Sequence, residues 1–204
     1  MSRTISDYTI QNPILLKSKK IGKKSTGTWY TLILRPAEFK EIIKNVNRKY
    51  EVIFYSLLLT GMRYEELYRF RQHPEWFDGN FIHLPSDTGQ KKVKRHTPER
   101  WIRLSIAGKI QVKSLFDIEL PKSSSIINQY LYYNFPNIKY LGVKTFRKTW
   151  ESWLVFYFSG KSGVEIMIAE SQGHTTITQF HHYLNMPFTE KDKMEMREFV
   201  EGWV

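Results

Sequence analysis

The chain has 204 residues, of which 41% are hydrophobic and 15% aromatic, so it is long enough and apolar enough for one globular domain with a hydrophobic core. It has 31 lysines and arginines against 20 aspartates and glutamates, a formal charge of +11. The absence of cysteine excludes disulfides, thiol nucleophiles and cysteine-ligated zinc. The charge favours a polyanionic partner, although a lysine-rich surface that only serves solubility explains it equally well.

The sequence has no feature of a membrane or secreted protein. No apolar run approaches the roughly 20 residues that a membrane helix needs. Residues 1–4 lead into no apolar signal region. We therefore expect a soluble protein of the cell interior, with no membrane partner.

The first 35 residues are polar and basic. Five lysines lie between positions 17 and 24, and the glycines at 22 and 27 argue against a regular helix there. We interpret this segment as either a solvated tail or an arm that follows a DNA backbone.

The next part of the chain has the apolar spacing of helices. One helix begins at Pro36 and continues through an apolar stripe that reaches Val46. A second helix is predicted over about 50–59 and breaks at Gly61, and a short helix over about 64–71 follows it. Turn residues at 74 and 78–79 end this part.

Two short strands follow, over 81–84 and 101–104, and the basic loop 89–96 joins them. Beyond Pro121 the pattern is again helical. It predicts helices over about 124–134, 144–158, 164–171 and 175–184, and a last segment after position 187. The fold class that we predict is mainly α with one small antiparallel β-sheet, an α+β domain.

Four short segments carry residues suited to phosphate chemistry. In the first, residues 60–67 (TGMRYEEL), Arg63 lies just past a glycine at the mouth of a helix. A guanidinium there can bind two phosphate oxygens. A surface ion pair with Glu66 is the alternative, and Glu66 could also orient Arg63.

The second segment is KTFR, residues 144–147, at a predicted helix start. Lys144 and Arg147 are three positions apart, so both charges can reach one anion beside the helix N-terminus. An exposed basic face is the commoner explanation of such a pair on its own.

The third segment is His174 with the glycine before it, and the fourth is Tyr183. They are nine positions apart, so a turn and a helix can bring them together. A tyrosine hydroxyl, with a pKa near 10, attacks phosphorus only where the phosphate charge is offset and a proton acceptor is near. A half-buried packing tyrosine is the alternative.

With these segments in this order, the sequence resembles the tyrosine recombinase/integrase family over roughly residues 36–190. TGMRYEEL resembles the family's first arginine box, and KTFR lies where the family has its second box, usually HxxR. Residues 173–184 resemble the G-H…Tyr box, with its nine-residue step to the nucleophile. The lysine at position 144 resembles integrases of archaeal viruses and plasmids, which suggests an archaeal mobile element.

The resemblance implies the roles of individual residues. Arg63 and Arg147 would bind the scissile phosphate, His174 would donate a hydrogen bond to it, Lys144 would move a proton, and Tyr183 would form a 3′-phosphotyrosyl link. The family also places a lysine in the β-hairpin to protonate the leaving oxygen. Of the three hairpin lysines we choose Lys92, and we expect its neighbours to contact DNA: Lys91, Lys94 and Arg95.

The resemblance therefore implies a site-specific recombinase that acts on double-stranded DNA without cofactor, ATP or metal. It implies a catalytic domain over 36–204, a homotetramer on DNA that is a monomer or weak dimer when free, and a place in the cytoplasm near the nucleoid of a prokaryotic or virus-infected cell. A non-catalytic DNA-binding accessory protein and a type IB topoisomerase-like enzyme are the alternatives. Adjacent histidines at 181 and 182 diverge by about 100° on a helix, which disfavours a metal site.

Both ends of the chain leave alternatives open. The family normally has a helical N-terminal domain, whereas about 35 mostly polar residues precede the first predicted helix here. The chain is then a free-standing catalytic domain, a shortened one, or one that relies on a partner for its second DNA contact. From about residue 190, apolar residues form a segment that docks either on a neighbouring subunit or on its own domain.

Overall fold

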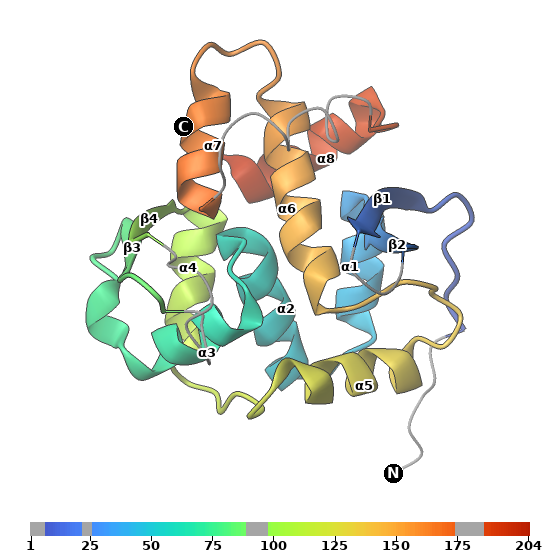
Figure 1. The fold of residues 1–204 in the computed structure, drawn as a ribbon, viewed down its shortest axis with the longest axis horizontal. Helices are drawn as coiled ribbons and strands as arrows, with labels where there is room; N and C mark the ends of the chain where they lie inside the picture. Colours follow the sequence, from blue (N-terminus) through green and yellow to red (C-terminus); the bar gives the residue numbers. More distant parts are fainter. Residues whose placement is uncertain (1–6, 22–25, 89–97, 174–185) are drawn as a thin grey trace.

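The structure is a computed structural model that describes residues 7–21, 26–88, 98–173 and 186–204. Within these ranges the chain forms eight α-helices, one short 3-10 helix and two small antiparallel sheets of two strands each (Figure 1). The predicted fold class, mainly α with a small antiparallel sheet, is confirmed. One of the two sheets, the one nearer the N-terminus, is an addition, because the sequence indicated only one.

The elements follow one another in this order: β1 (Ile14–Ile21), β2 (Thr26–Ile33), α1 (Pro36–Lys44), α2 (Arg48–Thr60), α3 (Tyr64–Gln72), η1 (Pro74–Trp76), β3 (Phe81–Leu84), β4 (Arg100–Arg103), α4 (Ile106–Leu115), α5 (Ser124–Asn134), α6 (Val143–Tyr157), α7 (Val164–Gln172) and α8 (Glu190–Val200). The predicted helix over 175–184 lies outside the described residues.

Helix α6 runs through the middle of the molecule and organises its core (Figure 1). It packs against α2, α7, α8 and strand β2. Its buried aromatic side chains fill the space between these elements: Phe146 stacks on Phe54 of α2 with 4.7 Å between ring centroids, and Trp150 and Trp153 are fully buried. Burial of such large side chains is a principal source of stability in a domain of this size.

The N-terminal segment contains an unexpected β-hairpin. Strands β1 and β2 pair antiparallel, from Ile14 opposite Ile33 to Ile21 opposite Thr26. At the open end of the hairpin, Ile14, Leu32 and Ile33 are buried in the common core. The hairpin agrees with the prediction that this segment forms no regular helix. A role for this segment as a DNA arm, and the domain boundary at residue 35, stay predictions.

The sheet of β3 and β4, and then helix α4, follow the turn predicted at residues 74–79. Strand β3 has the predicted bounds, and β4 begins one residue earlier than predicted. Helix α4 was missed, because Ile106 and Ile110 are exposed and blur its apolar face. Its N-terminus has an ordinary cap, in which the Ser105 hydroxyl accepts a hydrogen bond from the backbone N–H of Gly108 at 3.1 Å.

The C-terminal helix α8 packs on its own domain, against α1, α4 and α6. Met196, Phe199, Val200 and Trp203 are buried there, whereas Met194 is exposed. The alternative of packing in cis therefore describes this segment, and contact with a neighbouring subunit stays a prediction. Of the helices that the structure describes, none combines the length and apolar character needed to cross a membrane.

Candidate functional site

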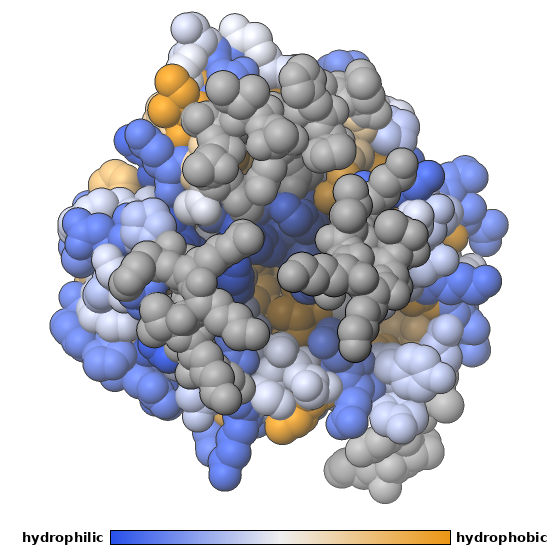
Figure 2. Space-filling model, in the orientation of Figure 1, coloured by the Kyte–Doolittle hydropathy of each residue, from blue (hydrophilic) through white to orange (hydrophobic). Residues whose placement is uncertain are grey.

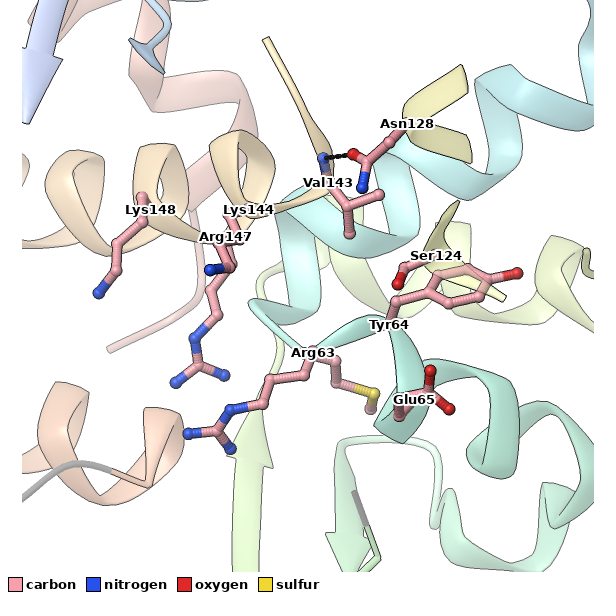
Figure 3. A pocket seen from close by; sticks show the side chains of 10 residues that line it. Arg63, Tyr64, Glu65, Ser124, Asn128, Val143, Lys144, Arg147 and Lys148 are labelled. Carbon is pink, nitrogen blue, oxygen red and sulfur yellow. Dashed lines mark hydrogen bonds between the residues drawn. The ribbon is translucent and has the colours of Figure 1, made fainter. Parts of the chain in front are cut away.

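A pocket of about 410 Å³ opens where the start of α3 meets the start of α6. Four cationic side chains line it, together with the carboxylate Glu65: Arg63, Lys144, Arg147 and Lys148 (Figure 3). In the hollow in the middle of the face shown in Figure 2, the visible described residues include both hydrophilic and hydrophobic ones. An excess of positive charge in a pocket suits an anionic ligand.

A sharp turn between α2 and α3 places Arg63. Helix α2 ends at Thr60, and Gly61 adopts the left-handed conformation with φ +61°. The Thr60 hydroxyl accepts a hydrogen bond from the backbone N–H of Met62 at 3.2 Å, which holds the turn. Arg63 then caps α3, and its side chain, 44% exposed, reaches toward the guanidinium of Arg147 (Figure 3).

The buried carboxylate of Glu66 lies beside Arg63. Its side chain is only 2% exposed, and one oxygen accepts a hydrogen bond from Nη1 of Arg63 at 2.7 Å. The other oxygen accepts from the Arg63 backbone N–H at 2.8 Å and lies 2.7 Å from Nη2 of Arg100. Glu66 therefore both orients Arg63 and offsets its charge.

The environment of Glu66 keeps it ionised. Burial alone raises the pKa of this carboxyl, but the charges of Arg100, Arg147 and Arg63 outweigh burial and lower its pKa to about 2.

Each of the three guanidinium nitrogens of Arg147 has a partner in the protein. Nη1 donates to the carbonyl oxygen of Gly61 at 2.7 Å, Nη2 donates to that of Gln172, and Nε lies 2.9 Å from a carboxylate oxygen of Glu151. Burial lowers the pKa of Arg147, while Glu151 and Glu66 act in the opposite direction. These contacts fix the guanidinium at the back of the pocket with little freedom to turn.

Lys144 and Lys148 lie on α6 on either side of Arg147. Lys144 is exposed at the mouth of the pocket, one position into the helix, and Lys148 binds Glu151 with 2.6 Å between Nζ and Oε2. Asn128 of α5 accepts a hydrogen bond from the backbone N–H of Val143 at 3.0 Å and holds this helix start (Figure 3). The positive end of the helix dipole adds to the lysine charges.

Helix α7 ends next to the same cluster. Gly173 closes it in the left-handed conformation with φ +65°. The neighbouring Gln172 is fully buried, and its side chain lies against Gly61. The Arg100 guanidinium donates through Nε to the carbonyl oxygen of Ser171 at 3.3 Å. Arg100 thus joins β4 to the last turn of α7, at a residue three positions before 174.

The fold is similar to that of a transposon integrase. The match is the structure of the Tn1549 transposon integrase (residues 82–397) in complex with circular intermediate DNA, with a TM-score of 0.50 and 14% sequence identity. It covers 81% of this chain and 66% of the integrase chain, so this protein spans slightly less than two thirds of that structure. No protein-family model and no curated protein matches the sequence. At this identity the likeness shows the fold alone.

The structure brings three of the predicted catalytic residues to one pocket: Arg63, Lys144 and Arg147. Their roles in catalysis stay predictions. The other predicted site residues lie outside the described residues: Lys91, Lys92, Lys94, Arg95, His174 and Tyr183. Among the residues that are described, no group of three or more metal-ligating side chains comes together.

Sequence reasoning missed three residues of this cluster: Arg100, Glu151 and Gln172. The position of Glu151, four residues after Arg147 on one helix, was a signal that could have found it. Arg100 precedes the predicted strand, and nothing near it in the sequence points to Glu66. Gln172 immediately precedes the G-H segment, and its burial depends on contacts between distant parts of the chain.

Proposed function

We propose that the protein is a site-specific DNA recombinase of the tyrosine recombinase type, which cleaves and rejoins double-stranded DNA through a 3′-phosphotyrosyl intermediate. One observation carries the proposal. Arg63 and Arg147, which lie on different helices far apart in the sequence, line the same cationic pocket. Two guanidinium groups in one pocket suit a phosphodiester, whose two unesterified oxygens carry its charge.

The surroundings of the two arginines support a transition-state role. Buried Glu66 and Glu151 hold them through hydrogen bonds and ion pairs of 2.7 to 2.9 Å. Charge that is fixed before the reaction stabilises a pentacovalent phosphate without reorganisation during the step. This arrangement needs no metal ion to offset the phosphate charge, and we assign none to the reaction.

In the proposed step, the Oη of Tyr183 attacks phosphorus and the bond to the 5′ oxygen breaks. The phenolic proton passes to a base, for which we assign Lys144, while His174 donates a hydrogen bond to the phosphate. The leaving 5′ oxygen takes a proton from Lys92. The energy of the broken bond is kept in the phosphotyrosyl link, so the reverse attack by a 5′ hydroxyl rejoins DNA without ATP.

The similar fold of an integrase bound to circular intermediate DNA supports duplex DNA as the partner. We propose that recombination takes place in a homotetramer on DNA, near the nucleoid of the host cell. The lysine at position 144 favours an archaeal mobile element as the source.

The test uses nicked suicide duplexes that carry candidate sites, incubated with wild type and with Tyr183→Phe and run on denaturing gels. We expect a protein–DNA adduct that survives SDS, forms in EDTA and is absent from the Tyr183→Phe variant. Labelled 3′ and 5′ ends of the cleaved strand identify which end is joined to protein. Tight DNA binding with no adduct on any substrate would favour the non-catalytic accessory protein instead.

A further inference from the structure

The hairpin of β1 and β2 has the composition of a polyanion-binding surface. Residues 14–33 contain five lysines and no aspartate or glutamate. In strand β2, the side chain of Trp29 is 62% exposed. The ring centroid of the next residue, Tyr30, lies 5.4 Å from that of Tyr140, whose side chain is 51% exposed. Lys17 is exposed and lies opposite Tyr30 in the strand register. Exposed aromatic rings beside lysines suit a ligand that offers both phosphates and apolar groups, such as the thymine methyl groups of a DNA groove.

The base of this hairpin is fixed to α6. The backbone N–H of Leu34, which directly follows β2, donates to the Thr149 hydroxyl at 3.0 Å. The indole N–H of Trp153 donates to the carbonyl oxygen of Leu34 at 2.8 Å. Both partners are buried residues of α6. The base of the hairpin is therefore attached to α6 by hydrogen bonds as well as by packing.

The same helix carries the phosphate pocket. Thr149 lies two residues after Arg147, and the segment from Val143 to Thr149 is about 9 Å long at 1.5 Å per residue. On the other side, Tyr140 lies four residues before Lys144. The hairpin and the pocket are therefore linked through one helix and through the contact of Tyr30 with Tyr140, and we expect a duplex that binds in the pocket to reach the hairpin within one DNA turn of about 34 Å.

We infer that the β1–β2 hairpin is a second DNA-binding element, a two-stranded ribbon that enters the major groove beside the scissile phosphate. A major groove about 12 Å wide admits such a ribbon. Strands β1 and β2 are paired over eight residues each, and cross-strand pairs alternate between the two faces of the ribbon. Lysine and aromatic residues on a ribbon of this kind contact both walls of a groove.

This inference rests on the proposed function only for its ligand, duplex DNA, and not for the cleavage chemistry. The test compares the triple variant Lys17→Gln, Lys19→Gln and Lys20→Gln with a control that removes equal charge from other elements: Lys49→Gln, Lys113→Gln and Lys191→Gln. The three control lysines are exposed on α2, α4 and α8. Binding of a fluorescent duplex about three turns long is followed by anisotropy, at salt concentrations from about 50 to 200 mM.

We expect the ribbon variant to bind at least about tenfold more weakly near 0.1 M salt. The slope of log K against log salt should fall by about 0.9 for each lysine that no longer contacts a phosphate. The control should change affinity less than about twofold, because its charges act only at long range. Equal loss in the two variants would overturn the inference, since the effect would then be one of total charge.

A second measurement tests the groove and the aromatic residues. Dimethyl sulfate methylates guanine N7, which lies in the major groove. Wild type should protect guanines beside the bound site, and Trp29→Ser with Tyr30→Ser should lose that protection. The control triple variant should keep it. Protection that persists in the ribbon variants would contradict a ribbon in the groove.

The outcomes separate this inference from the proposed function. Loss of affinity in the ribbon variants without any adduct in wild type supports the ribbon and contradicts the recombinase. An adduct in wild type together with unchanged DNA affinity in the ribbon variants supports the recombinase and contradicts the ribbon. Anionic vesicles and an RNA duplex are the competing ligands. Tighter ribbon-dependent binding to either than to DNA would overturn duplex DNA as the occupant.

Discussion

Glu66 and Arg100 form a buried ion pair, with 2.7 Å between Oε2 and Nη2, that joins helix α3 to strand β4. The same carboxylate binds Arg63, and Nη1 of Arg147 lies 3.8 Å away. One acidic side chain therefore connects three arginines on three elements. Because two of these arginines line the pocket, the geometry of the site depends on Glu66 staying ionised.

The stability of the protein should depend on pH through Glu66. The pKa of Glu66 in the folded protein is about 2, against an ordinary value of 4.5. A lowered folded pKa means that the stabilisation is complete above pH 4.5 and is lost as pH falls toward 2. Over this window the free energy of unfolding of wild type should fall by about 3 kcal/mol more than that of Glu66→Gln.

Urea denaturation followed by tryptophan fluorescence, at several pH values between about 6 and 2, measures this difference. Glu119→Gln, a change at an exposed glutamate, is the control and should follow wild type. Parallel pH profiles for wild type and Glu66→Gln would show that another carboxylate dominates acid unfolding.

The two pocket arginines should differ in what they contribute to stability. Arg147→Gln leaves the carbonyl oxygens of Gly61 and Gln172, and the carboxylate of Glu151, without a donor. We expect this change to lower the free energy of unfolding by about 2–4 kcal/mol. Arg63→Gln affects a half-exposed side chain and should cost less than about 1 kcal/mol.

Both arginine changes should slow adduct formation on suicide DNA by at least about 100-fold, because each removes a phosphate ligand. Denaturation curves and single-turnover adduct rates for the same two proteins check the contrast. A folded Arg63→Gln protein with wild-type adduct rates would remove Arg63 from the proposed mechanism.

Arg100 should act as a positioning residue. Its side chain is only 8% exposed, so it contributes little direct contact with DNA. Arg100→Gln should reduce the adduct rate by about tenfold while DNA affinity changes less than about twofold. Arg100→Lys, which keeps the charge, should recover part of the rate.

A double-mutant cycle of Arg100→Gln with Glu66→Gln measures the coupling between the two side chains. We expect a coupling free energy of about 1–3 kcal/mol in urea denaturation. Additive effects in the cycle, or equal losses of rate and affinity in Arg100→Gln, would argue that Arg100 contributes only to general stability.

Gly61 should tolerate no side chain. Its φ is +61°, and a Cβ there would lie 2.1 Å from Oε1 of the buried Gln172. Gly61→Ala should therefore displace Gln172, whose carbonyl oxygen accepts from Arg147. Gly160→Ala is the matched control, because Gly160 also has a positive φ, +85°, but a Cβ would meet no atom within 4 Å.

Thermal and urea denaturation should show a loss of about 1–2 kcal/mol for Gly160→Ala from backbone strain alone. The loss for Gly61→Ala should exceed it by at least about 1 kcal/mol, with reduced adduct formation. Equal losses in the two variants would mean that Gln172 moves aside without consequence.

Local signals predicted the part of the fold that depends on neighbours in sequence. Helix α5 and strand β3 have the predicted bounds, and Gly61 ends α2 where the pattern indicated a break. The β1–β2 hairpin was missed because the five lysines and two glycines between positions 17 and 27 hide the alternation of a half-buried strand. Helix α4 was missed because its outward-facing isoleucines conceal its buried side.

In the candidate site, too, only the relationships between residues close in sequence could be predicted. The position of Arg63 at a helix start, and the shared helical face of Lys144 and Arg147, follow from spacing of a few residues. The ion pair between Glu66 and Arg100 spans 34 positions, and the contact of Arg147 with Gln172 spans 25. Contacts over such separations depend on how the helices pack, which no local pattern specifies.

The hydrogen bonds of α6 limit which insertions and deletions the protein can tolerate during evolution. The helix presents Arg147 to the pocket, and Thr149 and Trp153 to the hairpin, in one fixed rotational phase. A single inserted or deleted residue between these positions would rotate one set by about 100° relative to the other. A change in the length of α6 would therefore separate the pocket from the hairpin.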